Sequence, residues 1–436
     1  MQIARRLLIT LATLLLAPQA GLAAESSAAS ERQESGSALD ELTRQARTRV
    51  DATARIALMP VNAAVFHGID GLENAAHGRV PNYLRAFGTM PAAVQPLAHL
   101  VKSVLYSGAV EPETKMAMGL RIAQIYRSSY LAAHLQRFLR ATEPGKRWLR
   151  ALETGDAASL KPAQRLALRY GENLTRDIHG VSDEDFREVR GYFNDSQIVE
   201  LTLTTCFFNH FTRLVEALHL PVEPWVLASD FTPPAVALAP PAARVGLIAD
   251  ETIQWAAEQA ASRPDAAGDA TGRAFRLANS QRAMFLSPEI AQAWRGFGFG
   301  RREGVVSREI KLHVSFAVSM ANGCRYCVLH QVQGLRRLNV SPAKLMQMKK
   351  DDSALTPREL TAVEFARLLT RDPAAVTDAG YAKLRAEFGE QGALELVLQT
   401  AAFAFMNRFT DGLRLPSEDE AIRVYREVYG GDFSVE

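Results

Sequence analysis

Two of the three cysteines in this 436-residue chain lie three positions apart, in the sequence Cys324-Arg-Tyr-Cys327. Sulfurs at this spacing are close enough to form a small disulfide ring. At the start of a helix, the unpaired N–H groups of the first turn favour a thiolate and lower a thiol pKa of about 8.5. A thiolate attacks peroxides or disulfides, and the second cysteine then resolves the sulfenic acid or mixed disulfide. The pair therefore predicts thiol redox chemistry.

Two histidines are candidates for moving the thiol proton. His330 lies three residues after Cys327, one turn along the same helical face, so we expect it to exchange a proton with that sulfur. His313 precedes Cys324 by eleven residues and would point at the same site if the break at Gly323 is shallow. The predicted catalytic residues are thus Cys324, Cys327, His330 and His313.

Other uses of the cysteine pair can be weighed from its neighbours. Val328 follows Cys327, so the Cys-x-x-Cys-His signature of haem attachment is not met. A zinc ion bound by Cys324, Cys327 and His330 would need a fourth ligand, and the chain has no second cysteine pair. We therefore predict no metal and no cofactor. A structural disulfide remains open, and Cys206, in a Phe-rich segment, is predicted to be a buried small hydrophobe.

The elements that must position these residues are predicted to be helices. Apolar residues recur with a period of 3.6 over residues 309–321 and 196–218. Thr356-Pro-Arg-Glu is a helix start signal, and Asn322-Gly323 is expected to end one helix just before the cysteine pair. Strand-like alternation bounded by tight hairpin turns is missing from the sequence. The predicted fold class is all-α.

The chain also repeats itself, at an offset of 196 residues that slips to 195. The identities occur in order along the chain and include His134 with His330, Leu174-Thr-Arg-Asp177 with Leu369-Thr-Arg-Asp372, Glu200 with Glu395, Arg213 with Arg408, and Leu220-Pro221 with Leu415-Pro416. We predict two homologous units at 41–225 and 246–436, joined by an extended Pro/Ala linker at 226–245.

The first unit is degenerate at the redox positions. Ser128 and Leu131 align with Cys324 and Cys327, and a Ser/Leu pair carries no thiol chemistry. We expect this unit to be a structural or interface half that buries apolar surface against the second, as two subunits of an oligomer do.

Charge and the N-terminus indicate an exported protein. Lys and Arg number 50 against 48 Asp and Glu, a net charge of +2. Residues 1–24 contain Arg5, Arg6 and no acid, so the chain without them has a charge of 2 − 2 = 0 and no electrostatic footprint for nucleic acid. Their positive start, short apolar run and small residues predict a cleavable signal peptide, an uncleaved anchor being the alternative. We expect a disordered tail at 25–40 and a periplasmic location.

The segment from Ala321 to Val328, Ala-Asn-Gly-Cys-Arg-Tyr-Cys-Val, resembles the signature of the alkylhydroperoxidase D-like, or carboxymuconolactone decarboxylase, family. The repeat closings Glu395-Leu-Val-Leu, Asn407-Arg and Leu415-Pro resemble the last helix of that family. The resemblance covers both repeats and implies two tandem helical bundles. It also implies a homo-oligomer, since members form trimers or hexamers. Redox-active members reduce organic hydroperoxides through the cysteine pair, which a dithiol partner recharges.

The chain departs from the family pattern at two positions. The pattern is Cys-x-x-Cys-x-x-x-His with a glutamate three helical turns upstream, whereas this chain has Gln331 and Leu312 there. His330 or His313 is therefore expected to take over the proton relay. The predicted function is a thiol peroxidase acting on a small organic hydroperoxide with a dithiol reductant. Alternatives are disulfide exchange with other proteins, or a non-catalytic module with a structural disulfide that binds a small apolar molecule.

Overall fold

The computed structural model describes residues 38–69, 79–228, 278–297 and 304–434. Within these ranges every regular element is a helix, which confirms the all-α fold class. A first helix includes residues 38–48. The elements that follow are η1 Arg49–Asp51, η2 Ala64–Phe66, α3 Asn82–Arg85, η4 Pro91–Ala93, α4 Val94–Tyr106, α5 Pro112–Ile125, α6 Ser129–Arg140, α7 Glu143–Thr154, η5 Ala157–Ser159, α8 Pro162–Arg176, α9 Asp183–Arg190, α10 Asp195–Ala217, η6 Pro224–Leu227, α12 Asn279–Met284, α13 Pro288–Gly296, α14 Arg308–Asn322, α15 Arg325–Arg337, α16 Pro342–Lys350, α17 Pro357–Arg371, η8 Pro373–Ala375, α18 Asp378–Gly412 and α19 Asp419–Tyr429.

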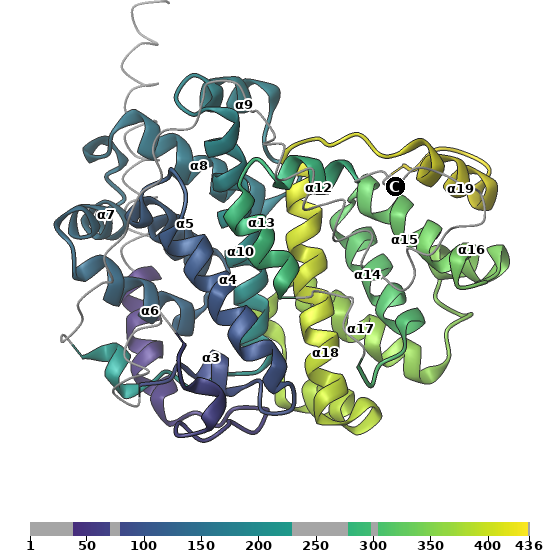
Figure 1. Cartoon of the computed structure of the whole chain (residues 1–436), viewed down its shortest axis with the longest axis horizontal. Helices are drawn as coiled ribbons and strands as arrows, with labels where there is room; N and C mark the ends of the chain where they lie inside the picture. The colour runs from purple at the N-terminus through teal and green to yellow at the C-terminus, as the bar shows by residue number, and fades with distance from the viewer. Residues whose placement is uncertain (1–37, 70–78, 229–277, 298–303, 435–436) are drawn as a thin grey trace, which may run out of the picture.

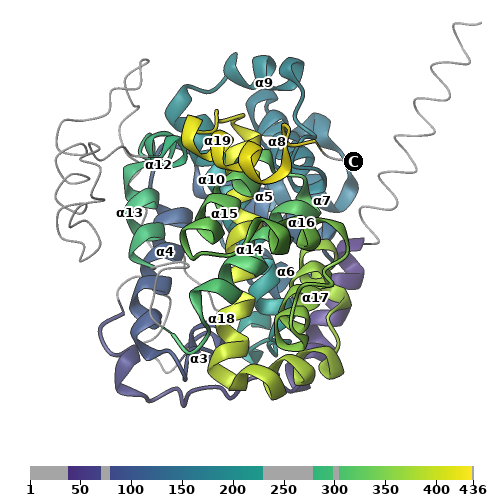
Figure 2. The same ribbon diagram turned by 90° about the vertical axis from the view of Figure 1, so that its right-hand side faces the viewer.

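Two long helices, α10 and α18, lie side by side along the boundary between the two halves of the chain (Figure 1). Every residue of α10 from 198 to 217 is buried, and α18 bends at Gly389, where φ is 69°. The second half, green to yellow in Figure 2, places α14, α15 and α16 on the far side of α18 from α10. One hydrophobic core therefore runs through both halves, with these two helices at its centre.

Contacts across this boundary are reciprocal. The guanidinium of Arg213 donates to the carbonyl of Thr370 at 2.7 Å, and that of Arg408 donates to the carbonyl of Thr175 at 3.1 Å. Both guanidiniums also donate to the hydroxyl of Tyr126, at 3.2 and 3.1 Å. The arginines and the threonines correspond by the repeat offset of 195. Two copies related by a twofold axis make contacts of this kind.

Buried ion pairs follow the same correspondence. Lys115 pairs with Glu200 in the first half, and Lys311 pairs with Glu395 in the second. Each glutamate also accepts backbone N–H groups of the segment before the paired helix, from Val110 in one case. We infer from these contacts and the sequence identities that the halves are duplicated units packed like two subunits.

The helices that position the cysteines begin and end where their sequences indicate. Residues 309–321 lie within α14 and residues 196–218 correspond to α10, as predicted. The hydroxyl of Thr356 accepts the backbone N–H of Glu359 at 3.3 Å, so the predicted start of α17 is also confirmed.

Two predicted segments, the tail and the linker, each have one wrong boundary. Residues 38–40 of the predicted tail (25–40) are helical, because Leu39 packs into the core with 2% of its surface exposed. Residues 226–227 of the predicted linker (226–245) belong to η6, where Val226 is buried. The predicted signal peptide, most of the tail and linker, and residues 246–277 lie outside the described residues. Among the described helices, none is long and apolar enough to cross a bilayer.

Candidate functional site

The cysteine pair lies at the junction of α14 and α15. Gly323 ends α14 in a left-handed conformation, with φ 72°, which glycine adopts without strain. Cys324 then caps α15, and its Sγ accepts the backbone N–H of Cys327 at 3.3 Å. Both side chains are thiols and are enclosed, with 0% and 3% of their surface exposed. The predicted position of the pair at a helix start is confirmed.

Both halves of the chain build the surroundings of the sulfurs. From α18, the hydroxyl oxygen of Thr410 lies 3.3 Å from Cys324 Sγ and 3.5 Å from Cys327 Sγ. From the first half, Ile178 in the loop after α8 packs against the two cysteines and Tyr326. The site is therefore complete only when the two halves are packed together.

An acid and a histidine lie between the buried sulfur and the surface. Asp411 of α18 is 14% exposed, and its Oδ2 lies 3.4 Å from the hydroxyl oxygen of Thr410, which in turn lies 3.3 Å from Cys324 Sγ. Oδ1 of Asp411 lies 3.7 Å from Nδ1 of His179, which is half exposed. Sequence reasoning missed both residues, because neither lies near the cysteines along the chain. The one signal available was that the repeat offset pairs Asp411 with another acid, Glu216.

Burial sets the proton affinities of this site. It raises the pKa of Cys324 well above its usual range, and the neighbouring Cys327 and Asp411 act in the same direction. Burial also raises the pKa of Asp411, although its interactions with Cys324 and His179 oppose that rise. The thiol therefore needs a base to become a thiolate near neutral pH, and Asp411 is the acidic group next to it, with the hydroxyl of Thr410 in contact with both.

The structure brings His330 to a glutamate and not to the sulfur of Cys327. Its Nδ1 lies 2.7 Å from the carbonyl oxygen of Tyr326, and its Nε2 lies 2.7 Å from Oε2 of Glu418. Burial opposes ionisation of Glu418, but the hydrogen bonds from His330 and from the backbone of Asn279 lower its pKa to about 2. Both ring nitrogens of His330 thus have partners other than a cysteine, and the predicted proton exchange with Cys327 has no contact to support it.

A matching cluster occurs in the first half, which has no cysteine pair. Its members correspond to those of the second half as Asn82 to Asn279, Tyr130 to Tyr326, His134 to His330, and Glu223 to Glu418. In the first half the cluster joins α6 to the segment after α10, and in the second half it joins α15 to the segment after α18. Because the cluster is present with or without thiols, we assign it a structural role.

His313 lies in a separate cluster, so its predicted place beside the cysteines is wrong. It is fully buried, with Nδ1 3.3 Å from Glu359 and Nε2 3.6 Å from Glu309. The nine residues from His313 to the end of α14 advance the chain by about 13 Å. α14 therefore presents His313 toward α17 and away from the thiols.

This second cluster has the geometry of a possible metal site. One ligand atom each from Glu309, His313 and Glu359 lies within 4.8 Å of the others, the one such group among the described residues. Lys344, however, places its Nζ 3.1 Å from Glu309 and 2.9 Å from Glu359. Its ammonium lies between the two carboxylates, so we assign a partly buried ion-pair network here.

Comparison with known proteins finds one family match, over part of the chain. Residues 288–368 match the sequence model of the carboxymuconolactone decarboxylase family. This stretch runs from α13 into α17 and contains both cysteines of the pair. No curated protein matches the chain. The match over residues 288–368 agrees with the family resemblance that the cysteine signature indicated.

Proposed function

We propose that this protein is a thiol-dependent peroxidase that reduces small organic hydroperoxides through Cys324 and Cys327. One observation carries the proposal. The hydroxyl oxygen of Thr410 lies 3.3 Å from Cys324 Sγ and 3.4 Å from Oδ2 of Asp411, and Oδ1 of Asp411 lies 3.7 Å from Nδ1 of the half-exposed His179. A buried thiol with a base and a route for its proton to reach solvent is what peroxide reduction needs.

The first step forms the nucleophile and breaks the peroxide. Asp411 takes the proton of Cys324, and the N–H of Cys327 stabilises the resulting thiolate. The thiolate attacks the terminal oxygen of ROOH, the O–O bond breaks, and Asp411 returns the proton to give ROH. Cys324 is then a sulfenic acid.

The second step restores a neutral pair. The thiol of Cys327 attacks the sulfenic sulfur, a disulfide forms, and water leaves with the thiol proton. A small dithiol then reduces the disulfide and is itself oxidised to a disulfide. The sum is ROOH plus dithiol giving ROH, water and a disulfide. Gln331 and Leu312, at the family's histidine and glutamate positions, do not titrate, so Asp411 and His179 supply the ionisable groups.

Enclosure of the sulfurs favours small reactants. Met406 and Leu415 are partly buried and cover the cluster of Ile178 and the two cysteines. Disulfide exchange with a folded protein requires a sulfur that the partner can touch. A small apolar hydroperoxide and a small dithiol need less space to reach the sulfurs. The enclosure therefore supports a peroxidase over an exchange protein.

The test is turnover of cumene hydroperoxide by the reduced protein with excess dihydrolipoamide. We expect turnover that disappears in Cys324→Ser and in Cys327→Ser. Cys206→Ala is the matched control, because Cys206 is buried in the core and the aligned residue is alanine, so turnover should persist. Absence of turnover from thiols shown by titration to be free would contradict the proposal and leave a structural pair.

A further inference from the structure

The side chain of Thr410 lies between the thiol pair and the acid. Its hydroxyl oxygen is 3.3 Å from Cys324 Sγ, 3.5 Å from Cys327 Sγ and 3.4 Å from Oδ2 of Asp411. Only 1% of the Thr410 surface is exposed. A hydroxyl has one donor hydrogen and two acceptor lone pairs, so it can accept from a thiol and donate to a carboxylate at the same time. Thr410 therefore has the chemistry to connect the sulfur with the acid.

The hydroxyl hydrogen of Thr410 has three acceptors within reach. Along its own helix the hydroxyl lies 3.0 Å from the carbonyl oxygen of Met406 and 3.3 Å from that of Asn407. The carboxylate of Asp411 is the third acceptor. Rotation about the C–O bond turns the hydrogen from a helix carbonyl toward the carboxylate, while the oxygen keeps its place beside Cys324.

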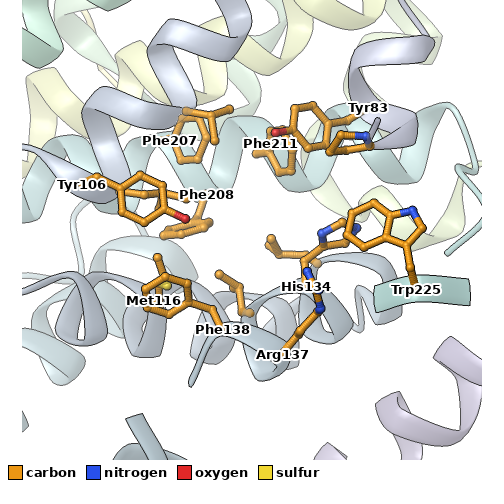
Figure 3. Close-up of a pocket in the computed structure, with 15 residues that line it drawn as sticks. Tyr83, Tyr106, Met116, His134, Arg137, Phe138, Phe207, Phe208, Phe211 and Trp225 are labelled. Atoms are coloured by element: carbon orange, nitrogen blue, oxygen red, sulfur yellow. The ribbon is translucent and has the colours of Figure 1, made fainter. Parts of the chain in front are cut away.

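The first half shows that the fold does not need this hydroxyl. By the repeat offset Thr410 corresponds to Val215, which is fully buried in α10. Leu131, at the position of Cys327, lines a small and mainly apolar pocket together with three phenylalanines of α10, Phe207, Phe208 and Phe211 (Figure 3). A valine thus fills the aligned position in the half without thiols, and a hydroxyl is present in the half that has them.

The enclosure of Cys324 is the reason that a relay is needed. Its side chain is 0% exposed, and burial holds its pKa well above the usual range. The titratable groups around it are Cys327 of α15, Asp411 of α18 and, beyond the acid, His179 in the loop after α8. A hydroxyl in contact with both the sulfur and the acid divides the proton transfer into two short steps.

We propose that Thr410 relays the proton of Cys324 to Asp411, an inference that rests on the proposed peroxidase function. The sulfur gives its proton to the Thr410 oxygen as the hydroxyl hydrogen of Thr410 passes to Oδ2 of Asp411. One proton leaves the sulfur, one reaches the carboxylate, and no electrons are transferred. Afterwards the protonated acid donates to Thr410, and Thr410 donates to the thiolate. The reverse transfer returns the proton when the O–O bond of the peroxide has broken.

The first test compares three substitutions by their rates of cumene hydroperoxide reduction. Thr410→Val keeps the shape of the side chain and removes the hydroxyl, so we expect a rate about a hundredfold lower, as for loss of a general base. Thr410→Ser keeps the hydroxyl and should remain within about twofold of the native rate. Thr400→Val is the matched control and should also keep the rate, because Thr400 is a buried threonine of α18 whose hydroxyl donates to the carbonyl of Leu396 at 2.8 Å.

A double variant separates a relay from a merely structural role. If Thr410 and Asp411 act as one unit, Thr410→Val combined with Asp411→Asn should be no slower than Asp411→Asn alone. Two independent losses would instead multiply, and that result would overturn the relay.

Alkylation of the reduced protein by iodoacetamide at pH 7 tests the relay without peroxide. Mass spectrometry follows the reaction at Cys324. Thr410→Val should lower its rate about tenfold, because the thiolate loses a hydrogen-bond donor, and Thr410→Ser should restore the rate. A native protein that reduces no peroxide would refute the peroxidase, and the alkylation rates would still decide on the relay. Equal alkylation of Thr410→Val and the native protein would overturn it, since the proton would then pass directly to Asp411.

Discussion

The serine position of the first half and the cysteine position of the second lie in closely related surroundings, yet the acids beside them have different partners. Ser128 donates to Glu216 at 2.5 Å, whereas Cys324 Sγ lies 3.3 Å from the hydroxyl of Thr410, which also contacts the aligned acid, Asp411. In the first half Arg49 holds Glu216 through contacts of 2.8 Å to both oxygens, and both side chains are 8% exposed. The partner of that acid is thus a permanent cation.

The second half has a titratable partner in place of the permanent one. His179, half exposed, adjoins Asp411, and its counterpart by the repeat offset is Ala374. A histidine gains and loses protons near neutral pH, whereas an arginine does not. The same position is therefore part of a buried ion pair in one half and of the proposed proton route in the other.

The largest expected effect is on stability, in the first half. Arg49→Met leaves Glu216 buried without its cation, and breaking a buried pair costs about 3–5 kcal/mol. His179→Gln, at the exposed partner of the other acid, should cost less than about 1 kcal/mol. Urea unfolding followed by circular dichroism measures both. Equal losses would show that the two acids do not differ in the way described.

The second prediction moves the cysteines. In a Cys324→Ser background, the double substitution Ser128→Cys and Leu131→Cys gives the first half a complete pair. We expect a turnover at least about a hundredfold below that of the native pair, because Glu216 is held by Arg49 and passes no proton. Steady-state peroxide consumption measures it. Turnover near the native level would show that pairing Glu216 with Arg49 does not limit peroxide reduction.

The third prediction concerns the proton route itself. Asp411→Asn should lower the rate of peroxide reduction about a hundredfold, the usual contribution of a general base. Since the carboxylate is the active form, the native rate should fall as the pH drops below the raised pKa of Asp411, and the variant should lose that acid limb. A pH–rate profile tests this. His330→Gln is the control and should keep the native profile, because its ring faces Glu418.

The fourth prediction compares the two glutamates of the matching clusters. Glu223 is 4% exposed and accepts three donors, so Glu223→Gln should cost about 2 kcal/mol. Glu418 is 31% exposed, and Glu418→Gln should cost less than about 1 kcal/mol. Thermal melting at pH 7 measures the order, and the reverse order would contradict the assigned burial.

The pH dependence of Glu418 gives the smallest effect. Its pKa is about 2 in the folded protein, against about 4.3 for an unperturbed glutamate. The stability that it adds is present above about pH 4.3 and is lost as the pH falls toward 2. Glu418→Gln should therefore flatten the loss of stability between pH 4.3 and 2, as acid titration of the folded state would show.

The helices and the cysteine pair could be predicted because their signals are local. Thr356 accepts a backbone N–H in the first turn of α17, and Gly323 ends the last turn of α14. Cys324 and Cys327 are three residues apart, so one turn of helix sets the distance between them. The ends of the tail and of the linker were placed wrongly because Leu39 and Val226 find their apolar partners far along the chain.

The partners of the titratable residues were not predictable in this way. His313 and His330 were assigned to the sulfurs from their distance along the sequence, but the direction in which a helix faces depends on what packs against it. α17 brings the carboxylate of Glu359 to His313, α16 brings Lys344 to that carboxylate, and the segment after α18 brings Glu418 to His330. Sequence distance alone does not decide which charges meet.

The sequence by itself determined an all-helical chain, a thiol pair capping a helix, and an offset that pairs residues of the two halves. Only the tertiary structure decided what the thiol can exchange its proton with. The loop after α8 crosses from the first half to place Ile178 and His179 beside Asp411 and Cys324 of the second. The reason is physical, since the packing of α10 against α18 sets which loops meet, and no local signal encodes that packing.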